Sequence, residues 1–154
     1  MAIKLLLNAP TSINCKVYPL NWKETDILRK FLMEEEEKGY IRQGSSPYTA
    51  PVFFVGKKDS EELWPVMDYH ELNKWMERDN NPLLNIRMAL ENLQEGELYL
   101  KFDLHWGYKN LRIKEEDQTK AVFKTTFGTY IPRVTYFGLT NAPPTFQQVI
   151  HQDL

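Results

Sequence analysis

The most restrictive pattern in this sequence is a pair of short apolar runs on either side of a polar, turn-forming segment. The runs are Val52-Phe53-Phe54-Val55 and Leu63-Trp64-Pro65-Val66-Met67, and Lys57 to Glu62 lie between them. Runs of β-branched and aromatic residues around a turn are typical of a β-hairpin.

A helix is predicted ahead of this hairpin. Asn21 with Glu24 three residues later is typical of a capping box at a helix start. Apolar residues then recur at helical spacing (Ile27, Leu28, Phe31 and Leu32), and Gly39 suits the helix end. The acidic run 34–37 falls inside this helix, and its simplest interpretation is a solvated face.

The second half of the chain predicts mixed structure. Helices are expected from about Leu84 to Leu93 and from Pro143 through Val149. Residues Glu97 to Asp103 alternate apolar and polar side chains, which indicates a half-buried strand. Further strands are expected near Lys109 to Ile113, Ala121 to Thr125 and Thr129 to Tyr136. This order of elements predicts an α+β fold.

Composition narrows the class of protein. The 154 residues suffice for one domain, with 42% apolar and 26% charged residues as in globular proteins. No run approaches the roughly 20 apolar residues of a membrane span, so no membrane partner is expected. The single cysteine, Cys15, forbids an internal disulfide and suggests a reducing, intracellular location, in cytoplasm or nucleus. The net charge of −2 decides nothing about nucleic acid, because phosphate contacts depend on local basic patches.

Several collinear segments resemble the reverse transcriptases (RNA-directed DNA polymerases) of gypsy-type long-terminal-repeat retrotransposons. They are Lys38-Gly39-Tyr40-Ile41-Arg42, Ser46-Pro47-Tyr48, Pro51 to Val55, Lys57-Lys58-Asp59, Met67 to Lys74, Phe102 to Tyr108 and Phe137 to Gln147. Together they extend from about Val17 to the last residue. The order of the segments, more than any one of them, carries the resemblance.

The resemblance implies an α+β right-hand polymerase fold, of which this chain supplies an N-terminal fingers and palm fragment. Residues 1–16 are then a leader, and 17–154 form a partial, incomplete reverse transcriptase domain. The fingers are expected at about 17–78 and 111–141. The palm is expected at about 79–110 and 142–154.

The reaction that the resemblance implies is template-directed nucleotidyl transfer from deoxynucleoside triphosphates (dNTPs) to a primer 3′-hydroxyl. The implied partners are an RNA or DNA template with its primer, and dNTPs. The implied cofactor is Mg²⁺ (or Mn²⁺), which takes carboxylate ligands. Asp103 is the expected catalytic, metal-binding aspartate, and the competing interpretation is an aspartate that merely ends a strand.

Six residues match dNTP-binding positions of the family: Lys57, Lys58, Gly107, Tyr108, Phe137 and Gly138. A lysine at the hairpin tip would reach the triphosphate, and the Tyr108 ring would exclude a ribose 2′-hydroxyl. Phe137 and Gly138 would line the pocket. The alternatives are exposed turn lysines, a core aromatic residue and a plain turn glycine.

The pattern departs from the family in four places. No Tyr-x-Asp-Asp motif, the source of two further aspartates, occurs up to Leu154, so we expect this chain to be inactive alone. Trp64 replaces an arginine that contacts the triphosphate, His70 replaces another arginine, and Thr135-Tyr136 replaces Met-Pro. The alternative functions are a non-catalytic nucleic-acid-binding remnant and a domesticated interaction module. The remainder of a polyprotein is a further expected partner, and an exposed apolar surface with poor solubility is expected without it.

Overall fold

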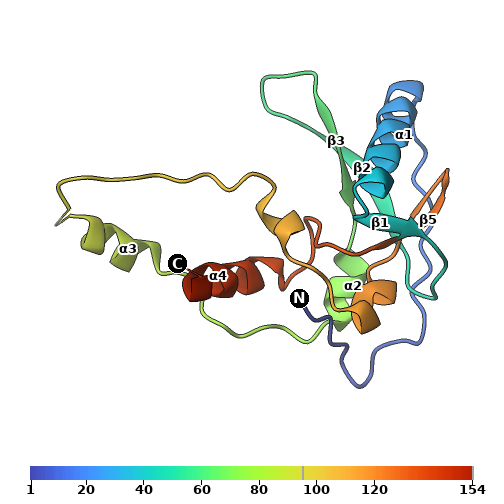
Figure 1. The fold of residues 1–154 in the computed structure, drawn as a ribbon. Helices are drawn as coiled ribbons and strands as arrows, with labels where there is room; N and C mark the ends of the chain where they lie inside the picture. Colours follow the sequence, from blue (N-terminus) through green and yellow to red (C-terminus); the bar gives the residue numbers. More distant parts are fainter. Residues whose placement is uncertain (95, 154) are drawn as a thin grey trace.

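The computed structural model describes residues 1–94 and 96–153 (Figure 1); Leu154, the predicted end of the domain, lies outside them. The helices are α1 (Trp22–Glu37), α2 (His70–Trp75), α3 (Ile86–Leu93) and α4 (Ala142–Asp153), with 3₁₀-helices η1 (Gly107–Asn110) and η2 (Glu115–Lys120). The strands are β1 (Ile41–Gln43), β2 (Ala50–Gly56), β3 (Leu63–Met67), β4 (Phe123–Thr125) and β5 (Gly128–Pro132). The predicted α+β class is confirmed.

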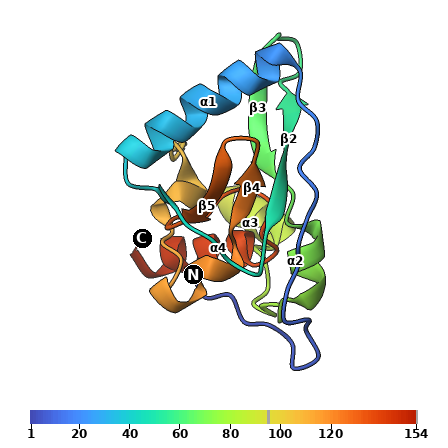
Figure 2. The same ribbon diagram turned by 90° about the vertical axis from the view of Figure 1, so that its right-hand side faces the viewer.

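The five strands form one sheet in the order β1-β5-β4-β2-β3. β2 and β3 pair antiparallel, with Val52 opposite Met67, so the predicted hairpin is confirmed. β4 and β5 form a second antiparallel hairpin, and β2 joins the two hairpins by pairing parallel to β4. Figure 2 shows β2, β4 and β5 side by side.

Helix α1 begins where the sequence predicts. The Asn21 side chain accepts a hydrogen bond from the Glu24 backbone N–H, and the Glu24 carboxylate accepts one from the Asn21 backbone N–H. Leu28 and Leu32 are buried, and Figure 2 shows α1 crossing in front of the sheet. The interpretation of the acidic run as a solvated face is wrong for Glu35, which is 2% exposed. Glu35 follows Leu28 by two helical turns, so it lies on the buried stripe.

The first residues of the chain pack into the body of the domain. Ile3 is fully buried, and its N–H donates to the buried carboxylate of Asp117 at 2.9 Å. Lys120 bridges the same two residues through its ammonium group. Ile13 forms a β-bridge with Tyr48. This pairing places the N-terminal segment along the edge of the domain.

The strand predicted at Glu97 to Asp103 is wrong. The described part of this segment is irregular and exposed, and Figure 1 shows it extending with α3 away from the sheet. Its alternation predicts a half-buried strand, but none of the described strands pairs with it. Backbone donors and acceptors without a neighbouring strand stay with water. The predicted helix α3 is present, yet none of its residues is buried.

Two other predicted strands differ from the structure. Residues 107–110 form η1, and only Arg112 makes a β-bridge, to Val134. The strand expected through Tyr136 ends at Pro132. A left-handed backbone at Trp106 starts the tight turn that replaces an extended conformation. Of the helices in the described part of the chain, none is long and apolar enough to cross a membrane.

Candidate functional site

The structure brings three of the predicted site residues together. The rings of Tyr108 in η1 and Phe137 meet edge to face, with centroids 5.0 Å apart. Tyr108 also meets Phe146 of α4 at 5.5 Å. A Cβ on Gly107 would lie 2.9 Å from the Phe146 ring, so glycine permits α4 to approach η1 this closely.

The two rings of this pair differ in exposure. Tyr108 is half-buried and packs against the core, whereas Phe137 is 63% exposed. The inner edge of the Tyr108 ring therefore agrees with the alternative interpretation of this residue as a core aromatic. The exposed Phe137 beside it leaves a ring surface that a ligand can reach.

The backbone conformation and close packing at position 138 favour glycine. Its φ of 106° lies in the region that favours glycine, and an added Cβ would lie 3.1 Å from the Met67 carbonyl oxygen. Asn73 holds this turn from both sides: its amide donates to the Gly138 carbonyl at 2.6 Å and its oxygen accepts from Thr140 N–H. The sequence assigns Asn73 no role, although it lies in one of the family-like segments.

An apolar pocket opens beside the aromatic pair, with a volume of about 530 Å³. The β2–β3 hairpin contributes Trp64, Pro65 and Val66, and η1 and its turn contribute Trp106 and Tyr108. The indole ring centres of Trp64 and Trp106 lie 5.7 Å apart, and both side chains line the pocket. Concave, mostly apolar pockets with a few polar groups are typical of small-molecule sites.

The lysines that are predicted to contact the triphosphate do not lie next to the aromatic pair of Tyr108 and Phe137. Lys57 and Lys58 lie in the turn of the β2–β3 hairpin. Lys57 makes an ion pair with Glu62 at 3.6 Å, with both side chains 62% exposed. Exposed ion pairs of this kind contribute little to stability, so Lys57 is free to exchange partners.

Asp103 lies in the exposed segment and makes none of the hydrogen bonds or ion pairs found in the described structure. Within residues 1–94 and 96–153, no three His, Cys, Asp or Glu side chains gather where they could hold a metal ion. One exposed carboxylate does not fit the several oxygen ligands that Mg²⁺ requires from protein and substrate. The described residues alone therefore do not form the implied metal site.

Sequence reasoning misses a buried polar cluster below the aromatic pair. The Glu35 carboxylate accepts hydrogen bonds from the Lys109 ammonium at 2.8 Å and from the Tyr136 hydroxyl. Burial, and then the hydrogen bond to Glu35, raise the pKa of Tyr136 well above its ordinary value. Spacing could have revealed Glu35, because it continues the stripe of Leu28 and Leu32. Nothing local in the sequence identifies its partners.

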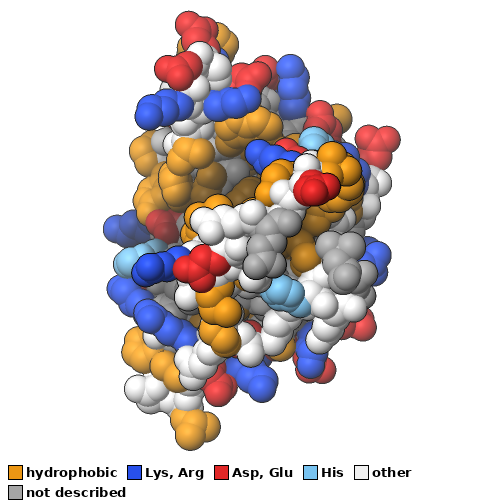
Figure 3. Space-filling view, turned by 90° about the vertical axis from the view of Figure 1, so that its left-hand side faces the viewer, with side chains coloured by type: hydrophobic (Ala, Val, Ile, Leu, Met, Phe, Trp, Pro, Cys, Tyr) orange, Lys and Arg blue, Asp and Glu red, His pale blue; other side chains and the backbone are white. Residues whose placement is uncertain are grey.

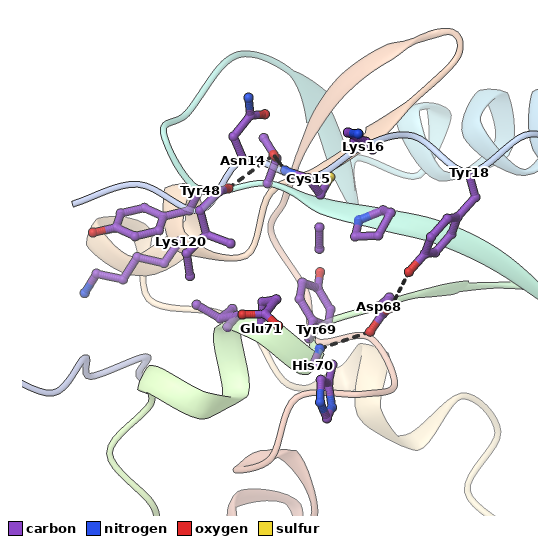
Figure 4. A pocket seen from close by; sticks show the side chains of 15 residues that line it. Asn14, Cys15, Lys16, Tyr18, Tyr48, Asp68, Tyr69, His70, Glu71 and Lys120 are labelled. Atoms are coloured by element: carbon purple, nitrogen blue, oxygen red, sulfur yellow. Dashed lines mark hydrogen bonds between the residues drawn. The ribbon is translucent and has the colours of Figure 1, made fainter. Parts of the chain in front are cut away.

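A second pocket of about 320 Å³ lies between the N-terminal segment, β2 and α2 (Figure 4). Asp68 at its rim accepts hydrogen bonds from the Tyr18 hydroxyl at 2.8 Å and the His70 N–H at 3.1 Å. The hydrogen bond to Asp68 raises the pKa of Tyr18. In Figure 4 the His70 ring points away from the pocket.

Comparison with known proteins identifies relatives over most of the chain. The family model described as reverse transcriptase (RNA-dependent DNA polymerase) matches residues 55–154. A retrovirus-related Pol polyprotein from transposon 297 of Drosophila melanogaster is 32% identical over 158 residues, covering 99% of this chain. The corresponding polyprotein from transposon gypsy of the same species is 29% identical over 153 residues, covering 96%. The Tf2-3 polyprotein of Schizosaccharomyces pombe is 30% identical over 134 residues, covering 87%. The chain spans 15% of the two Drosophila polyproteins and 10% of the yeast one.

Proposed function

The chain belongs to the reverse transcriptase family, and from this we propose that it is part of an RNA-directed DNA polymerase of the gypsy-type retrotransposon group. The reaction is template-directed transfer of a nucleotide from a dNTP to a primer 3′-hydroxyl. The division into fingers at about 17–78 and 111–141 and palm at about 79–110 and 142–154 is part of this proposal. The contact between Tyr108 and Phe137, from two distant segments matched to nucleotide binding, carries it.

In this proposal the aromatic pair meets the sugar of the incoming nucleotide. The Tyr108 ring is fixed between Phe137 and Phe146, so it cannot turn aside for an additional hydroxyl. A deoxyribose then fits and a ribose is excluded by contact at C2′. Gly107 keeps the backbone close to the Phe146 ring, and Gly138 keeps the turn after Phe137 close to Met67. Lys57 and Lys58 reach the triphosphate as mobile charges.

Reverse transcriptases generally depend on a divalent metal ion. We assign Asp103 as one carboxylate ligand of that ion, with the others contributed by residues elsewhere in the polyprotein. An exposed carboxylate with no hydrogen bond or ion pair in the described structure is available for such a role. Template, primer and the rest of the polyprotein are the partners that this assignment requires.

The test is nucleotide binding by the chain itself. Titration of dATP and ATP, followed by tryptophan fluorescence, should show tighter binding of dATP, and Tyr108→Val should reduce the ratio of the two affinities several-fold. Tyr99→Val is the matched control, since Tyr99 is exposed and outside the pocket. Equal affinity for dATP and ATP in the unchanged chain, or no binding of either, would contradict the proposal.

A second candidate function is nucleic-acid binding without catalysis. Across residues 1–94 and 96–153, no three His, Cys, Asp or Glu side chains gather where they could hold a metal ion, which favours this candidate. Primer–template binding that weakens with salt, together with no Mg²⁺-dependent extension in a polyprotein context, would support this candidate over the polymerase.

A further inference from the structure

Glu35 is the most buried carboxylate among the described residues and connects three parts of the chain. It lies on α1 with 2% of its surface exposed. Its two carboxylate oxygens contact Lys109 of η1 and Tyr136, which follows β5, while Lys38 lies 3.7 Å away at the end of α1. A buried charge is costly unless it is fully paired, and this one is paired on both oxygens.

Lys109 at the wall of the apolar pocket is held mainly by groups of the protein itself. Its side chain is 13% exposed, and its ammonium lies 4.3 Å from the ring centre of Trp106. The rings of Phe31, Tyr40 and Tyr136 also surround it, at 5.6 to 5.8 Å. Cation–π contact and one carboxylate thus satisfy this ammonium inside the protein.

The two partners of Glu35 are the immediate neighbours of the aromatic pair. Lys109 follows Tyr108, and Tyr136 precedes Phe137. One carboxylate therefore holds the side chains of the residues next to both rings, whose centres lie 5.0 Å apart. Replacing a buried ion pair by apolar residues is often neutral for stability, so a pair such as this one serves placement more than stability.

We propose that Glu35 is a positioning residue that sets the placement of Tyr108 against Phe137 and thereby the discrimination between deoxyribose and ribose. The inference rests on the proposed function, because it takes Tyr108 as the ring that meets the sugar. It assigns to the acidic stretch of α1 a role in specificity that local sequence does not indicate.

The test compares Glu35→Gln with Glu37→Gln, an exposed position in the same acidic run. Two quantities are measured: the ¹⁹F resonance of 3-fluorotyrosine at position 108, assigned with Tyr108→Phe, and the ratio of dATP to ATP affinity. Glu35→Gln should shift or broaden the Tyr108 resonance and lower the affinity ratio by about 3- to 10-fold, as expected for coupled neighbours. Glu37→Gln should leave both unchanged.

A variant without the charges separates positioning from folding. Glu35→Met combined with Lys109→Met keeps apolar volume in the site and should fold, yet it should still lower the affinity ratio. If either variant is folded and matches the unchanged chain in both quantities, the inference is overturned. If the Tyr108 resonance moves but the unchanged chain binds neither nucleotide, the proposed function fails, and with it the role of Glu35 in discrimination.

Discussion

Two tyrosines place their hydroxyl groups inside the core. Tyr69 is buried, and its hydroxyl donates to the Ala121 carbonyl at 2.8 Å. Tyr136 is also buried, and its hydroxyl donates to the Glu35 carboxylate. Burial raises the pKa of both hydroxyls far above the ordinary tyrosine value, and the neighbouring carboxylate raises that of Tyr136 further. Both groups therefore stay protonated in the folded chain at pH values where an unfolded chain ionises.

This linkage predicts loss of stability at alkaline pH. A tyrosine whose folded pKa is raised contributes its full stability below the unfolded pKa, about 10, and loses it as pH rises above that value. The free energy of unfolding should fall by about 1.4 kcal/mol per pH unit for each such tyrosine. Urea denaturation between pH 8 and 11.5 measures the slope, which Tyr69→Phe and Tyr136→Phe should each reduce.

The control for this slope is Tyr99→Phe. Tyr99 is exposed, and the structure places it in the segment that extends away from the sheet. Its removal should leave the pH dependence of the unfolding free energy unchanged. A slope that is the same in the Tyr69→Phe variant as in the unchanged chain would show that burial of this hydroxyl does not govern the alkaline limb.

The elements that the sequence predicts correctly are those defined by contacts close in sequence. The capping box at Asn21 and the hairpin of β2 and β3 depend on residues within a few positions of one another. The environment of Glu35 and of the segment 97–103 depends on parts of the chain far away in sequence. The acidic composition around Glu35 misleads, although its spacing after Leu28 and Leu32 agrees with burial. An acidic run predicts exposure until a lysine from η1 pairs with it, and alternation predicts a strand only where a neighbouring strand exists.

The same limit applies to the candidate site. Gly107, Tyr108 and Phe137 are identified from family-like segments, and the structure brings them together. Lys57 and Lys58 stay in the turn of the β2–β3 hairpin, and the role of Asp103 stays a prediction. Nothing in the sequence indicates that Trp64 contacts Trp106, because the contact joins two elements that only the fold brings together.

Helix α3 and the segment after it expose apolar side chains without burying any. Leu98 and Leu100 are both more than three-quarters exposed. Replacing both by lysine should raise the concentration at which light scattering appears, because the exposed apolar surface shrinks. The free energy of unfolding should change by no more than about 0.5 kcal/mol, since no buried contact is lost.

The buried residue Leu32 of α1 is the contrast for this change. Leu32→Ala removes core packing and should lower the free energy of unfolding by about 2–5 kcal/mol without improving solubility. Urea denaturation and light scattering measure both effects on both proteins. A large loss of stability on replacing Leu98 and Leu100 would mean that the segment is packed in solution.

The molecule as a whole consists of a packed body and an extended part that projects from it. The body contains the sheet, α1 and the aromatic pair, while α3 and the segment 97–104 reach away from it in Figure 1. The space-filling view of the face from which they project shows hydrophobic side chains exposed among charged ones (Figure 3). Since the chain spans only 15% of the relatives from transposons 297 and gypsy, the proposed activity is best measured with the chain placed in such a polyprotein.

That context gives the decisive measurement for Asp103. This chain should be exchanged for the matching segment of the transposon 297 polyprotein, after primer extension by that polyprotein has been established as the reference. The exchanged protein should extend a primer, and Asp103→Asn should lower its rate by about 1,000-fold or more, as loss of an essential carboxylate does. The variant should fold normally, because the Asp103 side chain is exposed.

Asp59→Asn is the matched control: it removes a carboxylate at a left-handed turn position that asparagine tolerates. If Asp103→Asn extends as fast as its parent, the assignment of Asp103 is wrong. If the exchanged protein binds primer–template and does not extend it, binding without catalysis is the function that remains.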